Sequence, residues 1–441
     1  GGGYVGIVDG ETKEAVALFR VTETNGTGVK RSVHMSFWNS DGSALLIANL
    51  HGKVLERIDI TRNAGGKIIA ADFSQSASLG VGKNMTISDN AKVYLGTNGQ
   101  GNPMIGSVSG SYDLADGFGD LTPAGNCKEN DCGDGPNGGR GNNVIICPIV
   151  SDSDKAYVTF GAGGLLVADT TATPMSIIGE YSNADDDYGI NGAGCGGVQV
   201  GDDMWLNAGV SASGAGATQS TFTMYTLDDT AFGPGYTPNS PMPTLVFKDS
   251  TNTTTIGNSV GPGTVNDTGQ LPSDSTRRDA HGMTRTVSGS HIHNVDRIQN
   301  NVEVFDTATL ARTTYDLTSA DGQGYGEGAC ADVSVTDDAG LPGNDPAPDL
   351  MDTTPDGKYL VVALRGPVPA SVLHAAQGSC PGVGMIRLLA NGKRGKLATV
   401  LRSSHTVPTT QDSTAVGGHD YTGSERSDIH GASVRTRVED M

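Results

Sequence analysis

Residues 33–60 read VHMSFWNSDGSALLIANLHGKVLERIDI and alternate short apolar runs with turns. The run VHMSFW is followed by the turn NSDGS, the run ALLIAN by a second turn at HGK, and the stretch ends on a third run, VLERIDI. Short runs of large apolar and β-branched side chains bounded by Gly, Asn and Asp are typical of strands joined by tight turns. This stretch therefore predicts three consecutive antiparallel strands.

The same plan recurs along the chain. It is found in residues 144–180, 279–317 and 348–400, more weakly in residues 194–228, and in a degraded form in residues 72–97. Each copy contains up to four short strands, and units of this kind repeated about every 40 to 60 residues are typical of β-propeller blades. The repeats therefore predict an all-β chain built as a propeller.

The two ends of the chain complete each other in this interpretation. Residues 4–20 match the closing strands of a unit, and residues 429–438 match an opening strand. A blade shared by both ends would remove the unpaired edges of an open ring. We therefore expect a single domain over residues 1–441, a seven-bladed β-propeller whose last blade is closed by both the N- and C-terminal strands.

Specific motifs carry a resemblance to a known superfamily. SDGSAL at 40–45 and PDGKYL at 355–360 precede apolar strands, and VEVFD at 302–306 follows one. This pattern resembles the YVTN-type and lactonase-like seven-bladed propellers over nearly the whole chain. That superfamily includes lactonases, metal-dependent oxidases, redox-cofactor carriers and pure binding proteins, so the resemblance implies the fold and no single activity.

The net charge of the chain limits the kinds of partner that it can bind. Lys and Arg number 29 against 49 Asp and Glu, which gives a formal net charge of -20. Nucleic acid and anionic membrane surfaces are repelled by such a surface, whereas cations complement it. The acidity also fits a protein that only needs to stay in solution. No apolar run approaches the roughly 18 residues of a membrane helix, so we expect no membrane insertion.

The cysteines and glycosylation triplets favour an oxidising compartment. The even set of 6 cysteines predicts disulfides, with Cys127–Cys132 and Cys330–Cys380 as the expected pairs. Cys147 and Cys195 are left as a buried disulfide, free thiols or soft ligands of a copper-type site. The chain starts at a Gly, as a processed form would. Asn-x-Ser/Thr triplets and the cysteines together predict an extracellular or periplasmic glycoprotein; the triplets begin at Asn25, Asn84, Asn252 and Asn266.

The opening strand of each unit carries the strongest candidate site. Aligning these strands brings polar or sulfur-containing residues to nearly one position, namely His34, Cys147, Cys195, His281, Asp349 and His430. The motif His-Gly recurs there in RDAHGMTR at 278–285 and SDIHGASV at 427–434. Opening strands line the channel of a propeller, so these side chains are expected to form a ring.

Imidazoles in such a ring predict a transition-metal site. His34, His281 and His430, with Asp349, are the expected ligands of Cu, Zn, Fe or Mn. Asp279 and Asp428, each two residues before a histidine, are expected to orient the rings. The alternative is a structural ring of polar side chains that ties one blade to the next and binds nothing.

Three weaker signals accompany the ring. His291 and His293 share one face of a second strand and could chelate a metal or face solvent. Two loops rich in Asp and Gly, 132–143 and 183–194, could bind calcium, but neither has the spacing of an EF-hand. His51 and His419 stand in Gly-containing loops and are expected at the surface.

Two functional hypotheses follow. Motifs of the common hydrolases, nucleotide-binding proteins and proteases are missing from the sequence. The first hypothesis is a secreted, metal-dependent oxidoreductase or lactonase-like hydrolase that acts on a small-molecule substrate. The second is a non-catalytic extracellular propeller, binding calcium or a protein partner as part of an assembly.

Overall fold

The computed structural model describes most strands of the chain and some of their connections. The residues described are 4–8, 15–20, 33–49, 54–66, 68–78, 92–97, 103–107, 145–160, 164–172, 175–181, 194–208, 222–234, 237–238, 240–248, 279–297, 299–336, 342–366, 378–403 and 429–434. In these residues the regular elements are strands, apart from the short 3-10 turns η2 (Asp229–Ala231) and η3 (Ala390–Gly392). None of the described residues belongs to a helix long and apolar enough to cross a membrane. The all-β prediction is confirmed.

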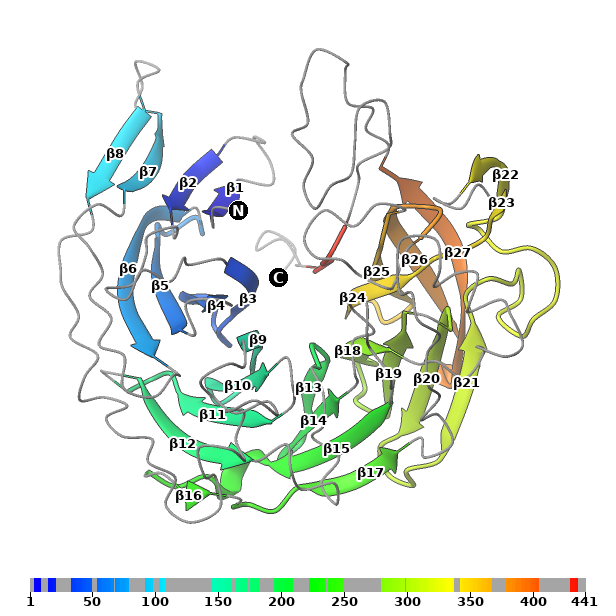
Figure 1. Ribbon diagram of the computed structural model, residues 1–441, viewed down its shortest axis with the longest axis horizontal. Helices are drawn as coiled ribbons and strands as arrows, with labels where there is room; N and C mark the ends of the chain where they lie inside the picture. The colour runs from blue at the N-terminus through cyan, green and yellow to red at the C-terminus, as the bar shows by residue number, and fades with distance from the viewer. Residues whose placement is uncertain are drawn as a thin grey trace, which may run out of the picture. The chain divides into compact units, whose positions relative to one another are not determined.

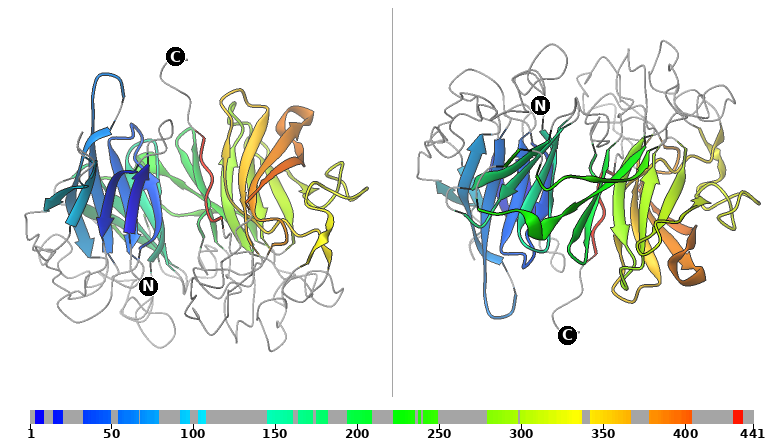
Figure 2. Two further views of the ribbon diagram at one scale, coloured as in Figure 1. Left: turned by 90° about the horizontal axis from the view of Figure 1, so that it is seen from above. Right: turned by 90° about the horizontal axis from the view of Figure 1, so that it is seen from below.

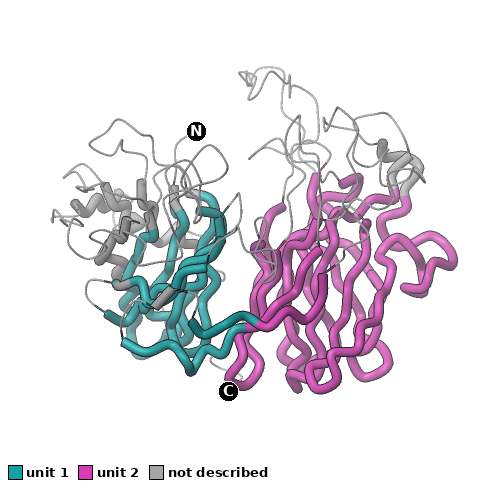
Figure 3. The backbone as a smooth tube through the Cα atoms, turned by 60° about the horizontal axis from the view of Figure 1, so that its bottom comes forward, with its two compact units in different colours: residues 1–193, 227–243 teal, residues 194–226, 244–441 magenta. Residues whose placement is uncertain are grey.

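The described chain falls into two compact units, coloured separately in Figure 3. The first contains residues 1–193 and 227–243, and the second contains residues 194–226 and 244–441. The expectation of one domain over the whole chain stays a prediction. Each unit is described below by itself.

The first unit contains three antiparallel sheets (Figure 1). One has the order β1 (Tyr4–Val8), β2 (Ala15–Arg20), β7 (Lys92–Thr97), β8 (Pro103–Ser107). The next is β3 (Val33–Trp38), β4 (Ala44–Asn49), β5 (Val54–Arg62), β6 (Ile68–Ser78). The third runs β9 (Ile145–Val150), β10 (Lys155–Phe160), β11 (Leu165–Asp169), β12 (Ser176–Tyr181), to which β16 (Thr237–Pro238) adds a parallel strand.

The second unit contains three four-stranded sheets and a two-stranded ribbon. The first sheet is β13 (Gly197–Val200), β14 (Asp203–Ala208), β15 (Thr223–Asp228), β17 (Thr244–Lys248). The second is β18 (Ala280–Arg285), β19 (His291–Asp296), β20 (Asn301–Asp306), β21 (Arg312–Asp316). The third is β24 (Pro348–Thr353), β25 (Tyr359–Leu364), β26 (Gly382–Leu389), β27 (Arg394–Arg402), and the ribbon is β22 (Asp332–Thr336) with β23 (Pro342–Gly343). Figure 2 shows the strands of each sheet standing side by side.

These sheets are propeller blades, but the predicted number of seven is wrong. The described residues contain five four-stranded sheets, together with the sheet that β16 extends and the ribbon. The degraded repeat at 72–97 is not a blade of its own, because β6 completes the sheet of β3 whereas β7 joins β2. The N-terminal strands are thus completed by β7 and β8, and the described C-terminal residues 429–434 form no strand. The predicted closure by both chain ends is therefore corrected.

The turns between first and second strands follow the sequence closely. In the first of them, Gly42 has φ 70 and Asp41 Oδ1 accepts the Ser43 N–H at 2.8 Å. The equivalent turn at 354–357 places Gly357 at φ 66. A left-handed residue favours glycine, and an Asp side chain stabilises the turn that contains it. The Asp-Gly pairs of the repeats therefore mark real hairpins.

The hydrophobic cores lie between neighbouring sheets of a unit. In the first unit, residues of β4 and β5 pack with residues of β9–β12, including Leu46, Leu55 and Phe160. In the second unit, a core that contains Trp205 and Phe305 joins the sheets of β13 and β18, and another joins β19–β21 with β24–β27. Face-to-face packing of this kind brings the first strands together: β3 contacts β9, β13 contacts β18, and β18 contacts β24.

Candidate functional site

The predicted ring position coincides with a β-bulge in the first strand of four sheets. In the pair β18–β19, Ala280 is opposite Asp296 and Met283 is opposite Asn294, so two residues face one. The same irregularity occurs in β3, β9 and β24. The residue pairs in the four bulges are His34–Met35, Ile146–Cys147, His281–Gly282 and Asp349–Leu350. Because bulges redirect side chains and are frequent beside functional sites, this position is structurally special in these four blades.

The bulge confirms the alignment of three predicted residues and corrects a fourth. His34, His281 and Asp349 are each the first residue of a bulge, as the repeat alignment requires. The equivalent residue of β9 is Ile146, so Cys147 is displaced by one position. Cys195 precedes β13, and His430 lies in the described segment that forms no strand.

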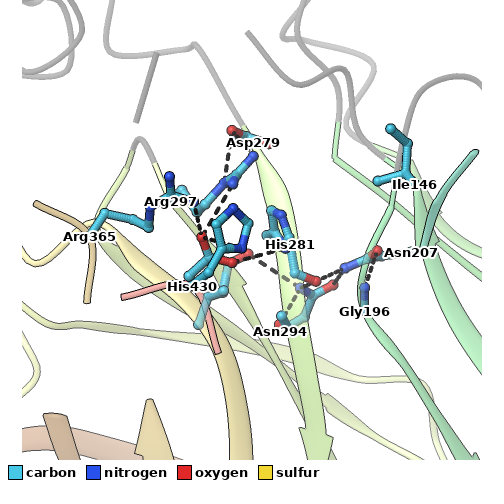
Figure 4. A network of polar contacts seen from close by, with 12 residues as sticks. Ile146, Gly196, Asn207, Asp279, His281, Asn294, Arg297, Arg365 and His430 are labelled. Carbon is cyan, nitrogen blue, oxygen red and sulfur yellow. Dashed lines mark hydrogen bonds and ion pairs between the residues drawn. The ribbon is translucent and has the colours of Figure 1, made fainter. Parts of the chain in front are cut away.

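Asp349 is the centre of a buried polar cluster in the second unit. Figure 4 shows His281, His430 and Arg297, which contact it, close together. The side chain of Asp349 is 0 % exposed. Oδ1 lies 3.3 Å from Nδ1 of His281, and Oδ2 lies 2.6 Å from Nη1 of Arg365 and 3.4 Å from Nη1 of Arg297. Nδ1 of His430 is 3.7 Å from the same Oδ2. The rings of His281 and His430 have centroids 6.1 Å apart and are arranged edge to face.

A second carboxylate balances the charge of this cluster. Nη2 and Nε of Arg297 lie 2.8 and 3.0 Å from Oδ2 of Asp279. Asp279, which was expected to orient His281, therefore accepts from Arg297. The negative charges of Asp279 and Asp349 balance the positive charges of Arg297 and Arg365. The whole cluster therefore carries no net charge when the imidazoles of His281 and His430 are neutral. Pairing of this kind is what allows ionised groups to be buried.

The surroundings of the cluster determine its protonation. Burial lowers the pKa of His281 well below its ordinary value, and the charge of Arg297 acts in the same direction. Burial alone would raise the pKa of Asp349, but the neighbouring imidazoles and guanidinium groups hold it well below its ordinary value. At neutral pH His281 is therefore a neutral imidazole and Asp349 is an ionised carboxylate.

Glycine at the second bulge position of β18 is required by close packing. A Cβ on Gly282 would lie 2.3 Å from the backbone oxygen of Asp349. The backbones of β18 and β24 thus meet at the bulge, which brings His281 against Asp349. Gly431 is under no such constraint, because the nearest atom to its Cβ would be Cδ1 of Leu350 at 3.7 Å. The two His-Gly motifs therefore have different structural causes.

The C-terminal segment 429–434 delivers His430 to this cluster. Oδ2 of Asp352 accepts the N–H of Val434 at 2.8 Å and the hydroxyl of Ser433 at 3.2 Å. Asp352 belongs to β24, so the segment lies against the same strand as Asp349. In Figure 1 the segment, drawn in red, lies beside β24. His430 thus occupies the predicted cluster through side-chain contacts and not as part of a blade strand.

His34 repeats one element of this arrangement in the first unit. Its Nδ1 lies 3.0 Å from the backbone oxygen of Ile146, the first bulge residue of β9. His281 has the same relation to Asp349 in the second unit. In both units, an imidazole at the bulge of one blade reaches the bulge of the next. The convergence of His34 with His281 and His430 stays a prediction.

Two buried amides hold the backbone of the bulge at His281. Nδ2 of Asn207 donates to the carbonyl oxygen of His281 and, at 2.9 Å, to Oδ1 of Asn294. Nδ2 of Asn294 donates to the carbonyl of Gly282 at 3.0 Å, and Oδ1 of Asn207 accepts the Gly196 N–H at 3.1 Å. The backbone groups that the bulge releases from the strand ladder are thus hydrogen-bonded by side chains, as buried polar groups require.

The pair His291 and His293 is buried in β19 and does not face solvent. Nδ1 of His293 lies 3.1 Å from the hydroxyl of Tyr315, and Nδ1 of His291 lies 2.8 Å from Oγ of Ser290. Burial lowers the pKa of His293 to about 3. In the described part of the chain, no group of three or more His, Cys, Asp and Glu side chains is arranged to hold a metal ion.

The cysteines bear out the disulfide prediction where they are described. Cys330 and Cys380 form a disulfide with Cα atoms 5.5 Å apart. Cys147 and Cys195 are also disulfide-bonded, so neither is a free thiol or a copper ligand. Cys127 and Cys132 lie outside the described residues, as do Asp428, His51, His419, the four glycosylation acceptors and, apart from Gly194, both candidate calcium loops.

The sequence interpretation missed the two arginines of the cluster. Arg297 directly follows β19 and Arg365 directly follows β25, so both occupy the same position after the second strand of their blades. A charged residue at the end of a buried strand, repeated in two units, was the available signal. Both side chains are almost fully buried, at 1 % and 0 % exposure.

Comparisons with known proteins found distant similarities to solved structures. No family model and no curated protein matches the chain. It is similar to a hydrazine synthase structure from Kuenenia stuttgartiensis (14% identity, 80% of this chain and 75% of that chain, TM-score 0.32). It is also similar to a protein from Lactobacillus plantarum (10% identity, 90% and 96%, TM-score 0.37). A candidate 6-phosphogluconolactonase from Bacteroides uniformis has 10% identity, 89% and 93% coverage and a TM-score of 0.34. Similarities at this level assign neither a family nor an activity.

Proposed function

We propose that this chain is an extracellular or periplasmic β-propeller that binds a transition-metal ion through histidines in and beside the first strands of its blades. The supporting observation is that Nδ1 of each predicted histidine faces an acceptor oxygen. These pairs are His34 with the Ile146 carbonyl at 3.0 Å, and His281 and His430 with Asp349 at 3.3 and 3.7 Å. The carbonyl beside His34 can only accept, which favours a proton on Nδ1 and a lone pair on Nε2 of that ring, and Asp349 places a carboxylate beside Nδ1 of the other two rings.

The chemistry of the side chains fits such an ion. A neutral imidazole is a good ligand of Zn, Cu and Fe, and burial keeps the pKa of His281 well below its ordinary value. Oδ2 of Asp349 is already paired with two guanidinium groups. We therefore assign Asp349, which the sequence suggests as a ligand, the role of orienting the two rings. His34 enters the proposal through the repeat alignment.

An ion at this place would polarise a substrate oxygen or lower the pKa of a bound water. The chain's own residues would supply the rest: Asp349 would orient the two imidazoles beside it, and Arg365 pairs with the Asp349 carboxylate. This suits a metal-dependent oxidoreductase or a lactonase-like hydrolase acting on a small molecule, the classes that the sequence resemblance suggests. The disulfide Cys330–Cys380 supports an oxidising compartment.

A second function is favoured by the charge balance of the cluster. Asp279 and Asp349 are each paired with an arginine, and both pairs are buried. In this second function, the network of paired charges joins neighbouring blades and binds no ion. The protein would then be a non-catalytic extracellular module whose acidic surface binds calcium or a protein partner.

Metal analysis of the purified protein separates the two functions. About one equivalent of Cu, Zn, Fe or Mn per chain supports the site, and His281→Ala or His430→Ala should then lose most of it. His34→Ala tests whether the third histidine contributes. His374→Ala, which changes a histidine assigned to no site, is the matched control. A wild-type protein without transition metal, or equal metal content in all four variants, would leave only the structural function.

A further inference from the structure

The carboxylate of Asp352 anchors the segment 429–434 on β24. Oδ2 of Asp352 accepts both the Val434 N–H at 2.8 Å and the Ser433 hydroxyl at 3.2 Å. Oδ1 of the same side chain accepts the N–H of Thr353 at 2.7 Å, which fixes its orientation on the strand. One oxygen of Asp352 is thus directed at the strand and the other at the C-terminal segment.

This anchor and the polar cluster are neighbours on one strand. Asp349 and Asp352 are three residues apart in β24, and His430 and Val434 are four residues apart in the segment. The segment therefore touches β24 at both of its ends, with His430 against Asp349 and Val434 against Asp352. Gly431 lies over Leu350 between the two contacts.

From this geometry we infer that Asp352 is a positioning residue: it docks the segment 429–434 on β24 and thereby places the His430 imidazole beside His281 and Asp349. Residues 429–434 form no strand, whereas His281 belongs to the strand β18. Hydrogen bonds to a carboxylate are stronger than those between neutral groups, which suits a single side chain to this task. The consequence for metal binding rests on the proposed function, because it requires His430 to be a ligand.

The test changes one oxygen of Asp352. In Asp352→Asn, the amide oxygen would still accept the N–H of Thr353. The NH₂ group would then replace Oδ2, and it cannot accept the N–H of Val434. Asp356→Asn is the matched control, since Asp356 is exposed on the following turn and accepts from Thr354 and Lys358 of its own turn. Equal melting temperatures of the variants would show that both fold.

Two measurements on metal-free protein test the anchor itself. Hydrogen exchange at the Val434 amide should become roughly tenfold faster in Asp352→Asn, because a charge-assisted hydrogen bond is lost. The reaction of diethyl pyrocarbonate with His430, followed by mass spectrometry, should accelerate as well. Asp356→Asn should change neither rate. Unchanged exchange or unchanged labelling of His430 in Asp352→Asn would overturn the inference.

Titration with Zn²⁺ alone then tests the link to the proposed site. Asp352→Asn should weaken Zn²⁺ binding about tenfold, as is usual for residues that orient a ligand, and Asp356→Asn should not. An altered exchange rate with unchanged affinity would overturn the role of Asp352 in the metal site. A wild-type protein that binds no Zn²⁺ would contradict the proposed function, whereas the exchange and labelling rates would still decide whether Asp352 positions His430.

Discussion

His281 and Asp349 are the first bulge residues of neighbouring inner strands, and Nδ1 of His281 lies 3.3 Å from Oδ1 of Asp349. The contact joins two blades through their most irregular backbone positions. His34 repeats the relation in the first unit with the carbonyl of Ile146. A recurrent imidazole at this place therefore has a structural role in either functional hypothesis, and a metal would use rings that are already oriented.

The close approach of β18 and β24 gives a first prediction. Gly282→Ala should destabilise the protein by about 1–3 kcal/mol, because the new Cβ would meet the Asp349 backbone oxygen and a backbone cannot move aside as a side chain can. Gly431→Ala is the matched change in the other His-Gly motif, and its Cβ would find ordinary contact distances. Urea unfolding of both variants measures the difference, and equal stabilities would contradict the packing argument.

A second prediction concerns Arg365. Arg365→Met removes the closest cation from Asp349, leaving a buried carboxylate with less compensation, so a loss of about 3–5 kcal/mol is expected. Arg387→Met changes an exposed arginine of β26 and should stay within about 0.5 kcal/mol of the wild type. Thermal and urea unfolding of the two variants provide the measurement. If both lose the same stability, the Asp349 cluster does not contribute to the fold as its geometry indicates.

The third prediction concerns pH and His293. Burial lowers the pKa of His293 from 6.5 to about 3 in the folded protein. Between these two values the unfolded chain binds the proton and the folded chain does not. The contribution of His293 to the free energy of unfolding is therefore fully present above pH 6.5. As the pH falls from 6.5 toward 3, this free energy decreases by about 1.4 kcal/mol per pH unit.

Comparison with a variant isolates this contribution from that of other groups. In His293→Gln, the amide retains a polar partner for the Tyr315 hydroxyl but does not titrate. The free energy of unfolding, measured in urea at pH 7.5 and 5.5, should therefore fall less in the variant than in the wild type. The same fall in both proteins would show that His293 is not kept neutral by the fold.

The strands and turns of the repeats could be predicted because they depend on short stretches of sequence. The runs and Asp-Gly turns of residues 33–60 and 348–400 correspond to β3–β5 and β24–β27. Strand formation and tight turns depend on residues close together in the chain, which a sequence displays directly. The pairing of β7 with β2 was misread for the opposite reason, since a strand's partner is selected by packing between distant segments.

The sequence likewise predicted some residues of the candidate site and not others. Repeat alignment found His281 and Asp349, because equivalent positions of a repeat lie at equivalent places in the fold. It placed Cys147 one residue away from its equivalent, because a bulge shifts the register and leaves no mark in the sequence. The buried arginines escaped notice, since charged side chains are usually exposed and only their partners stabilise them in the interior.

The sequence by itself determined the all-β repeats, the hairpin turns and the recurrence of polar residues at one place in several blades, and it suggested the pair Cys330–Cys380. Only the tertiary structure decided how many strands complete each sheet, where the bulges fall, that Arg297 and Arg365 neutralise Asp349, and that Asp352 holds His430 beside it. The physical reason is the separation along the chain of the residues that interact. Strand and turn preferences arise within a few residues, whereas burial, charge pairing and docking depend on groups that only folding brings together.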